Sequence, residues 1–295
     1  MIKKNPLVTI GIPTYNRVDL LERSIKSALE QDYRPIEILI SDNASTDQTQ
    51  ILCVEYAEKY KAIKYVRQIS NIGPTSNFDF VLHSAHGEYF MWLGDDDWID
   101  PGYINTCMNA YGAEPGLSLV AGTPVYYRRG NFDHVGRLFE IVNSSWMLRV
   151  IQYYMKVADN GMFYGVMRTS ELQETSMPNA LGGDWHLIAN IISLGKLRLC
   201  ATVSVHRELG GATSSFRKIV KSLKKPPIQA LFPFLTIAFG AFIYLIKAEG
   251  AYKRRGFLSR ILVATIVFLV ITLKSAKSAL GGMRRVAAKL LLIHN

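Results

Sequence analysis

The sequence predicts an α/β fold in which a largely parallel sheet carries helices on both faces. Over about the first hundred residues, short apolar segments typical of buried strands alternate with segments of helical periodicity. Such alternation indicates strands joined by crossover helices. Polar side chains follow several of these strands directly. Near residue 226 the composition changes, and the chain becomes apolar and basic.

The first four strands end at one edge of the predicted sheet. We expect strands over residues 7–12, 36–41, 63–67 and 89–93, with helices over 20–31, from the 42–47 segment to about 60, and over 77–85. Asp19 is the expected N-cap of the first helix, and the segment 42–47 supplies capping oxygens for the second. Right-handed crossovers place the carboxyl ends of these strands on one rim, where such sheets bind ligands.

Beyond Pro101 the alternation becomes less regular. We expect helices over 103–111, 147–157 and 185–194, and strands over 117–127, 161–168 and 197–206. Residues 128–142 form a polar excursion between two of these elements.

Three consecutive carboxylates, Asp95, Asp96 and Asp97, follow the fourth strand through Gly94. Adjacent anions repel one another, and a bound cation removes that cost. Carboxylate oxygens favour Mg²⁺ or Mn²⁺. A helix–loop–helix calcium site is excluded, because its glycine and glutamate are missing at the sixth and twelfth positions counted from Asp95. A solvated acidic turn remains the alternative interpretation.

Composition limits the class of protein. The 295 residues, 49% of them hydrophobic, suffice for one large domain or two smaller ones. The net charge of +10 arises beyond Arg217, which favours a membrane surface, and we expect no nucleic-acid partner. Cys53, Cys107 and Cys200 lie far apart and lack metal-ligand spacing, so a reduced, cytosolic compartment is expected. We expect no secretory signal before the first strand.

Ordered motifs resemble a known enzyme family. The glycine-rich motifs of dinucleotide-binding folds and P-loop ATPases are absent, which disfavours both classes. Instead, the chain resembles the family-2 glycosyltransferases of the GT-A fold over roughly residues 6–215. The segments that carry this resemblance are VTIGIPTYNR (8–17), ISDNASTD (40–47) and LGDDD (93–97). It implies transfer of a sugar from a nucleotide-diphosphate sugar.

The resemblance assigns nucleotide contacts to the first two motifs. Pro13, Thr14, Tyr15 and Arg17 would line the base and ribose, and Asp42 would accept a hydrogen bond from the base. Other roles stay open, because Pro13 and Tyr15 also suit a turn and its packing, and Asp42 also suits a helix cap.

The third motif departs from the family pattern, which is usually Asp-x-Asp-Asp. Gly94 stands at its first position, so Asp96 falls on the main metal-ligand position. Asp95 or Asp97 would complete the site for Mn²⁺ or Mg²⁺, and Asp95 is also a candidate nucleotide contact.

Two further family motifs are matched in part. Asn71 and Asn77 fit an Asn-x-Gly-x-x-x-Asn stretch, with Asn71 a candidate nucleotide contact and a structural role open for both. Members often carry Tyr-Arg-x-His-Gly-Gly after the last strand. Here Arg207 matches, whereas Leu209 replaces the histidine. His206 and Arg207 are therefore candidate diphosphate or acceptor contacts, with solvated loop residues as the alternative.

The catalytic base implied by the resemblance is Asp184. Inverting members place a carboxylate here, commonly as Glu-Asp, to deprotonate the acceptor hydroxyl, and Gly183 replaces that glutamate. A base must lie within hydrogen-bond reach of the nucleophile. Asp184 also suits a helix cap. Trp185 is a candidate wall for the acceptor sugar or a core residue.

A second region is expected after a pair of prolines, with a catalytic domain at 1–225 and a membrane-associated helical region at 226–295. The apolar segments 228–246 and 257–273 would be helices of about 29 and 26 Å, close to the ~30 Å hydrocarbon thickness. Their basic flanks favour anionic lipids. Two spans, helices in the membrane surface or re-entrant, and a soluble core all remain open.

These observations predict an inverting, metal-dependent sugar transfer to a membrane-held acceptor. A lipid-linked saccharide in O-antigen or capsule synthesis is expected, with a polyprenyl phosphate as the alternative acceptor, at the cytoplasmic face of a bacterial inner membrane. A catalytically silent, membrane-bound scaffold is the alternative of another class. Retention of Asp42, Asp96 and Asp184 speaks against it. Processive synthesis is disfavoured because the Gln-x-x-Arg-Trp motif is missing.

Overall fold

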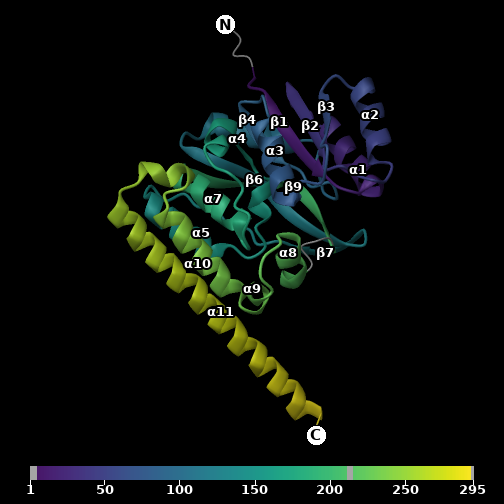
Figure 1. The fold of residues 1–295 in the computed structure, drawn as a ribbon. Coiled ribbons are helices and arrows are strands. Elements are labelled where there is room, and N and C mark those ends of the chain that lie inside the picture. The colour runs from purple at the N-terminus through teal and green to yellow at the C-terminus, as the bar shows by residue number, and fades with distance from the viewer. Residues whose placement is uncertain (1–4, 211–214, 294–295) are drawn as a thin grey trace.

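A mixed sheet forms the centre of the molecule (Figure 1). The computed structural model describes residues 5–210 and 215–293, with side chains as far as residue 275. Within these residues the sheet has nine strands, of which eight follow the order β3-β2-β1-β4-β8-β6-β9-β5, and the ninth, β7, pairs with β6.

The N-terminal half is the predicted parallel unit. Its strands are β1 (Val8–Thr14), β2 (Ile36–Asp42), β3 (Ile63–Arg67) and β4 (Tyr89–Trp92). The intervening helices are α1 (Val18–Leu29), α2 (Thr49–Lys59) and α3 (Pro74–His83). In the sheet register Thr14 lies beside Asp42, and Asp42 beside Arg67, so the carboxyl ends of three strands meet at one edge. The alternation is confirmed.

The second half extends the sheet with mixed strand directions. Its strands are β5 (Trp98–Ile99), β6 (Leu117–Arg128), β7 (Asn131–Val135), β8 (Val166–Arg168) and β9 (Lys196–Leu209). Its helices are α4 (Tyr103–Ala113), α5 (Trp146–Lys156), α6 (Thr169–Gln173) and α7 (Gly183–Leu194), with a 3-10 turn, η1 (Gly161–Tyr164). The predicted strand 161–168 divides into η1 and β8, and the polar excursion contains β7.

The cap of the first helix differs from the prediction, whereas the 42–47 segment supplies a capping oxygen to the second helix as predicted. Asp19 lies within the first turn of α1, which begins one residue earlier, at Val18. The Asp47 carboxylate accepts the backbone N–H of Val18 at 3.2 Å and that of Thr49 at 3.0 Å. One side chain from the β2–α2 loop therefore satisfies free donors at the starts of both helices.

The C-terminal region is helical, but its first apolar segment is interrupted. It contains α8 (Phe216–Ser222), α9 (Ile228–Leu231), α10 (Pro233–Ile246), η3 (Gly250–Arg254) and α11 (Phe257–Ile293). The helix expected over 228–246 breaks at Phe232, because the residue before a proline is disfavoured in the helical conformation. At 14 residues, α10 is about 21 Å long, shorter than the ~30 Å hydrocarbon thickness.

Only α11 is long and apolar enough to cross a membrane among the described residues. The qualifying segment is Phe257–Ser275, 19 residues with a mean hydropathy of 2.1. The more basic stretch after Lys274, expected to flank the last segment, falls mostly beyond the side chains that the structure describes.

The C-terminal helices share a core with the sheet domain. Ile237 and Ala241 of α10 and Val263 of α11 are buried within the same apolar cluster as the strands. Asn190 of α7 donates to the Glu249 carbonyl at 2.8 Å and accepts the N–H of Ala251 at 2.9 Å. The predicted domain boundary between residues 225 and 226 is therefore not a boundary in packing, because α10 and η3 cover α7.

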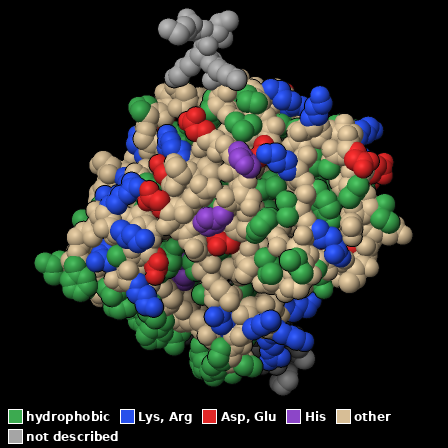
Figure 2. Space-filling view, turned by 45° about the horizontal axis from the view of Figure 1, so that its top comes forward, with side chains coloured by type: hydrophobic (Ala, Val, Ile, Leu, Met, Phe, Trp, Pro, Cys, Tyr) green, Lys and Arg blue, Asp and Glu red, His purple; other side chains and the backbone are tan. Residues whose placement is uncertain are grey.

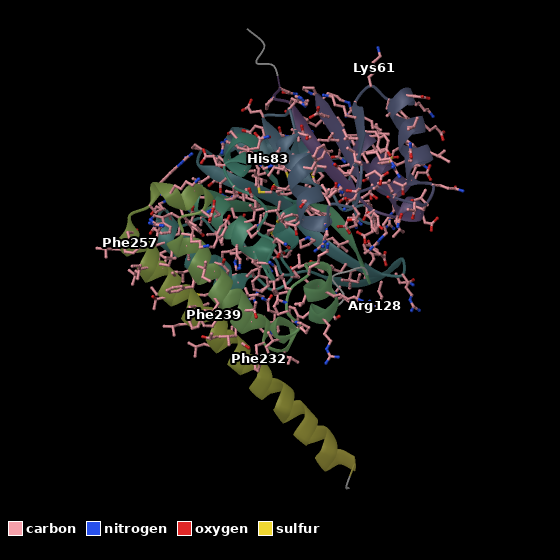
Figure 3. The ribbon with its side chains drawn as sticks, viewed as in Figure 1. Lys61, His83, Arg128, Phe232, Phe239 and Phe257 are labelled. Atoms are coloured by element: carbon pink, nitrogen blue, oxygen red, sulfur yellow. The ribbon has the colours of Figure 1, made fainter. Side chains whose placement is uncertain are left out.

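The opposite side of these helices is apolar and exposed. Phe232, Phe239 and Phe257 lie along it, each more than half exposed (Figure 3). Figure 2 shows hydrophobic side chains gathered along the lower left edge of the molecule. We call this surface the apolar face. Its exposed large side chains are Ile228, Leu231, Phe232, Leu235, Phe239, Ile243, Phe257, Leu258, Leu262, Leu269 and Leu273.

Candidate active site

A cleft of about 840 Å³ opens at the carboxyl edge of the parallel strands. It is lined by the turn after β1, the start of α3, the loop after β4, the end of β9 and the α8 segment. The lining residues are Pro13, Thr14, Tyr15, Arg17, Asn43, Asn71, Gly73, Pro74, Asn77, Phe78, Gly94, Asp95, Asp96, Tyr164, Arg207, Glu208, Lys218, Lys221, Ser222 and Lys224. This is the edge at which ligands bind in such sheets.

The turn after β1 is joined to the acidic loop after β4. The Thr14 hydroxyl donates to Asp95 Oδ2 at 2.9 Å, and the Tyr15 N–H approaches the same oxygen at 3.4 Å. Tyr15 is 43% exposed, so its ring is free to contact a ligand. The predicted nucleotide residues of the first motif are thus brought together with the predicted metal motif.

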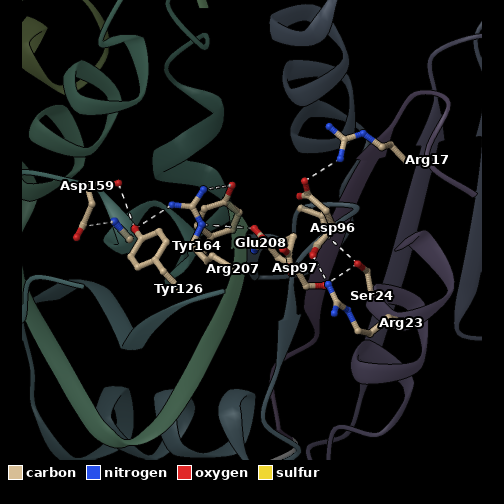
Figure 4. A network of polar contacts seen from close by, with 12 residues as sticks. Arg17, Arg23, Ser24, Asp96, Asp97, Tyr126, Asp159, Tyr164, Arg207 and Glu208 are labelled. Atoms are coloured by element: carbon tan, nitrogen blue, oxygen red, sulfur yellow. Dashed lines mark hydrogen bonds and ion pairs between the residues drawn. The ribbon is translucent and has the colours of Figure 1, made fainter. Parts of the chain in front are cut away.

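Asp96 lines the cleft and forms an ion pair with Arg17. Its Oδ2 lies 2.9 Å from Arg17 Nη1 (Figure 4). Arg23 donates to the Asp96 backbone carbonyl at 2.7 Å while its guanidinium stacks on Trp98. The backbone is therefore fixed, whereas the side chain of Asp96 is held by a single partner.

Asp97 is buried and does not line the cleft, so its assignment as a metal ligand stays a prediction. Its carboxylate accepts the Glu208 N–H at 3.1 Å and pairs with Arg207 Nε at 3.5 Å (Figure 4). The departure at the first motif position has a steric reason, because a Cβ on Gly94 would lie 2.6 Å from Asp97 Oδ2. Asp97 joins the acidic loop to β9.

Burial and repulsion by Asp96 raise the pKa values of two carboxyl groups in the acidic loop, those of Asp95 and Asp97. The pKa of Asp95 rises to about 7, chiefly through burial and then through the charge of Asp96. The pKa of Asp97 rises to about 6 by burial, against the attraction of Arg207. A cation in the cleft would favour the ionised form of these groups.

The carboxylates fit a metal that takes most of its ligands from a substrate. No cluster of three or more His, Cys, Asp or Glu side chains suited to a metal occurs in the described part of the chain. Asp95 and Asp96 nevertheless both line the cleft. Mg²⁺ is commonly held by one or two carboxylates together with phosphates and water, and these two residues meet that requirement.

Asp42 lies beneath the cleft and is not among its lining residues. It is fully buried, accepts the Ser45 N–H at 2.8 Å and the Tyr65 hydroxyl at 3.0 Å, and lies 3.4 Å from Arg67 Nε. Its oxygens thus already have partners, and a direct contact with the base stays a prediction.

The neighbouring Asn43 reaches the cleft instead and was missed by the sequence analysis. Its amide holds the loop before α3, donating to Asn71 Oδ1 at 3.1 Å and accepting the Ile72 N–H at 2.8 Å. Asn77 is nearly buried and donates to the Ser41 carbonyl at 2.9 Å. Both predicted asparagines line the cleft, with structural bonds of their own.

Arg207 and His206 face opposite sides of β9, as successive strand residues must. Arg207 lines the cleft and donates to the hydroxyls of Tyr126 and Tyr164, each at 3.1 Å (Figure 4). His206 stacks on Trp98 and bonds Asp100 at 2.8 Å, away from the cleft. His206 does not line the cleft, and its contact with a diphosphate or an acceptor stays a prediction.

Asp184 lies at the start of α7, outside the set of residues that line the cleft. Its Oδ2 accepts Asn160 Nδ2 at 2.8 Å, and the same amide accepts the Tyr153 hydroxyl at 2.6 Å. Burial raises its pKa, partly offset by the bond from Asn160. Gly182, not Asp184, is the N-cap of α7. Trp185 faces Lys274 of α11, whose Nζ lies 5.9 Å from its ring, and it does not line the cleft.

Several lining residues come from segments that the sequence analysis assigned elsewhere. Tyr164 lies in η1, and Lys218, Lys221 and Lys224 belong to the segment interpreted as the flank of a membrane helix. Their charge was visible in the sequence. Their return to the sheet edge depends on the path of the chain after β9, which no local pattern encodes.

Comparison with known proteins identifies the class. The model of the glycosyl transferase family 2 matches residues 9–173, more than half of the chain. The chain belongs to this family, which confirms the resemblance.

Curated relatives include a bacterial glucosyltransferase. The chain is 35% identical over 129 residues to the GalNAc(5)-diNAcBac-PP-undecaprenol beta-1,3-glucosyltransferase of Campylobacter jejuni, covering 43% of this chain and 41% of the relative. The chain spans less than half the length of this and the other most similar curated relatives.

Solved structures share the fold at low identity. S. aureus TarS 1–349 in complex with UDP matches with a TM-score of 0.57 and 15% identity, covering 84% of this chain and 75% of that one. A mannosyltransferase from Pyrobaculum calidifontis in complex with GDP-Man and Mn²⁺ matches with a TM-score of 0.53 and 18% identity, covering 98% and 81%. These matches confirm the predicted GT-A fold.

Proposed function

We propose that this protein transfers a sugar, with inversion, from a nucleotide-diphosphate sugar to a membrane-held acceptor in bacterial glycan synthesis. The observation that carries the proposal is the cleft, where the turn after β1, Asp95–Asp96 and Arg207 meet. The named activities of the family relatives support it. A lipid-linked saccharide is the favoured acceptor, and a polyprenyl phosphate is the alternative.

Different residues along the cleft would bind different parts of the donor. Thr14 and Tyr15 suit the nucleoside, while Asp95 and Asp96 would hold Mn²⁺ or Mg²⁺. Such an ion, when bound, neutralises charge on the leaving diphosphate. Arg17 now pairs with Asp96, and a diphosphate beside that carboxylate offers it another anionic partner. Arg207 lies across the cleft, and its guanidinium is held in place by hydrogen bonds to the hydroxyls of Tyr126 and Tyr164.

The proposed reaction is a single displacement at the sugar C1. The acceptor hydroxyl loses its proton to Asp184 as its oxygen bonds to C1, and the bond from C1 to the diphosphate oxygen breaks. The side-chain amide of Asn160 donates to Asp184 and so orients this catalytic carboxylate. Asp184 does not line the cleft. In this role, either the acceptor reaches Asp184 from the cleft, or Asp184 and the residues around it move toward the cleft.

The apolar face supports a location at the membrane. It is exposed along α9, α10 and α11, and basic residues lie at the turn between α10 and α11. Lipid would cover the apolar side chains, and anionic head groups would attract the basic ones. We place the enzyme at the cytoplasmic face of the inner membrane.

A ligand screen tests the donor and the metal together. Thermal unfolding is followed with UDP, GDP, CDP and dTDP, each with and without Mn²⁺. A ligand that binds only the folded protein raises its melting temperature, so one nucleotide with Mn²⁺ should stand out. A protein that responds to none of them would support the scaffold alternative.

A further inference from the structure

Three lysines line the cleft on the side opposite the sheet edge. Lys218 and Lys221 lie three residues apart on α8 and therefore on one side of that helix, and Lys224 follows its end. We call them the lysine rim. Their side chains are exposed, and no carboxylate of the described residues lies within ion-pair distance of them.

The two arginines of the other wall already have carboxylate partners. Arg17 pairs with Asp96, and Arg207 pairs with Asp97. A donor diphosphate beside Asp95 and Asp96 would have its charge neutralised there by the divalent ion. The rim would then remain a group of like charges that repel one another. A second anion in the cleft removes that repulsion.

The rim adjoins the beginning of the apolar face. α9 starts four residues after Lys224, and its Ile228 and Leu231 are 56% and 62% exposed. A cationic rim beside exposed apolar side chains matches an amphiphile with a phosphate head and a hydrocarbon chain. A nucleotide sugar has no apolar chain to use that surface.

We propose that Lys218, Lys221 and Lys224 bind the phosphate of a lipid-linked acceptor, while its lipid chain lies on the apolar face that begins at α9. The inference rests on the proposed function and deepens it by assigning the acceptor a phosphate next to the lipid. The donor could also bring a diphosphate to these ammonium groups, so the experiment separates the two sources.

Direct binding to the full chain in detergent micelles tests the rim. The probes are farnesyl diphosphate, farnesol as its phosphate-free counterpart, and UDP with Mn²⁺, replaced by whichever nucleotide the thermal screen selects. The rim variant is Lys218→Gln/Lys221→Gln/Lys224→Gln. The matched control, Arg217→Gln/Lys225→Gln/Lys253→Gln, removes as many positive charges from positions that do not line the cleft.

We expect wild type and control to bind farnesyl diphosphate at least about tenfold more tightly than the rim variant, because the three ammonium groups would each offer a charge-assisted hydrogen bond to the diphosphate. Farnesol should bind all three proteins equally, and nucleotide affinity should stay within about twofold. A parallel loss of nucleotide affinity would assign the rim to the donor and overturn the inference. An equal loss in the control, or no preference for farnesyl diphosphate over farnesol, would overturn it too.

The two proposals fail separately. If wild type bound no nucleotide yet the rim selected farnesyl diphosphate, the sugar-transfer proposal would fail while the phosphate site stood. Circular dichroism and the melting temperature of the rim variant establish that it is folded. Since its three side chains are exposed, the substitutions should leave both unchanged.

Discussion

Two adjacent carboxylates, Asp96 and Asp97, have opposite surroundings. Asp96 has one side-chain partner and lines the cleft, whereas Asp97 is 2% exposed and ties the acidic loop to β9. The sequence shows three equivalent aspartates. Only the packing of β9 and the steric demand at Gly94 distinguish them, and neither is a local property.

Substitution of these two residues should therefore have different effects, on activity for Asp96 and on stability for Asp97. Asp96→Asn should abolish turnover and the Mn²⁺-dependent stabilisation by nucleotide, yet leave the melting temperature of the free protein nearly unchanged, since a solvent-accessible ion pair such as Arg17–Asp96 contributes about 1 kcal/mol. Asp97→Asn should lower the free energy of unfolding by about 1–3 kcal/mol, because it leaves the partly buried Arg207 without its anion. Activity assays and urea unfolding measure both. Full activity of the wild type in EDTA would contradict the metal role.

Asp184 is suited to accept a proton, and its replacement isolates that role. Asp184→Asn keeps an oxygen to accept the Asn160 amide, so the fold should survive. Turnover should fall by a factor of about 10²–10⁴. Nucleotide affinity, measured by titration of the same variant, should change little. If donor binding collapses in parallel, Asp184 is a structural or donor-binding residue instead.

At the scale of elements, local periodicity predicted the strands and helices of the sheet domain well. β3 matches its predicted bounds, 63–67, because a short strand between two helices leaves little freedom. The break at Phe232 was missed, although Pro233 at the first position of a helix is itself a start signal. The position of α8 beside the cleft could not be predicted, since it depends on contacts between distant segments.

α10 has an inner and an outer side, and neighbouring residues can test each. A Cβ on Gly240 would lie 2.6 Å from His186 Nε2 of α7, whereas Phe239 is 52% exposed. Gly240→Ala should therefore lower the free energy of unfolding by about 1–3 kcal/mol through overpacking. Phe239→Ala should leave stability in detergent unchanged but reduce flotation with anionic liposomes. The reverse pattern would mean that the outer side is not the membrane-facing one.

His186 gives the contact between α7 and α10 a pH dependence. It bonds the Tyr154 hydroxyl at 2.8 Å, stacks on Tyr244, and burial lowers its pKa from 6.5 to about 3. Between these values the unfolded chain binds a proton that the folded protein does not. The free energy of unfolding should therefore fall as pH drops below 6.5, by about 1.4 kcal/mol per unit. Urea unfolding at pH 7 and pH 5 should show a smaller difference for His186→Gln than for wild type, and equal differences would contradict this account.

At the scale of the whole molecule, the cleft and the apolar face are parts of one packed body. The chain leaves β9, passes the cleft as α8, and reaches the apolar face within a few residues at α9 (Figure 1). Composition alone divides the chain at residue 226, because apolar and basic residues become frequent there. Packing does not follow that division, since the inner sides of α10 and α11 complete the core beneath α7.

Two truncations distinguish an anchor from a part of the core. A chain ending at Lys225 would uncover α7 and leave the buried amide of Asn190 without its partners in η3, and unpaired buried polar groups cost about 1–3 kcal/mol each. We expect it to aggregate or to unfold at a much lower temperature than the full chain. A chain ending at Ser275 keeps these contacts and loses only the part of α11 that projects from the body (Figure 1). It should melt within a few degrees of the full chain and retain nucleotide binding. The chain ending at Lys225 could instead prove monomeric, folded and active on a soluble acceptor analogue. The C-terminal helices would then serve only as an anchor, and their packing against α7 would contribute little to the stability of the catalytic fold.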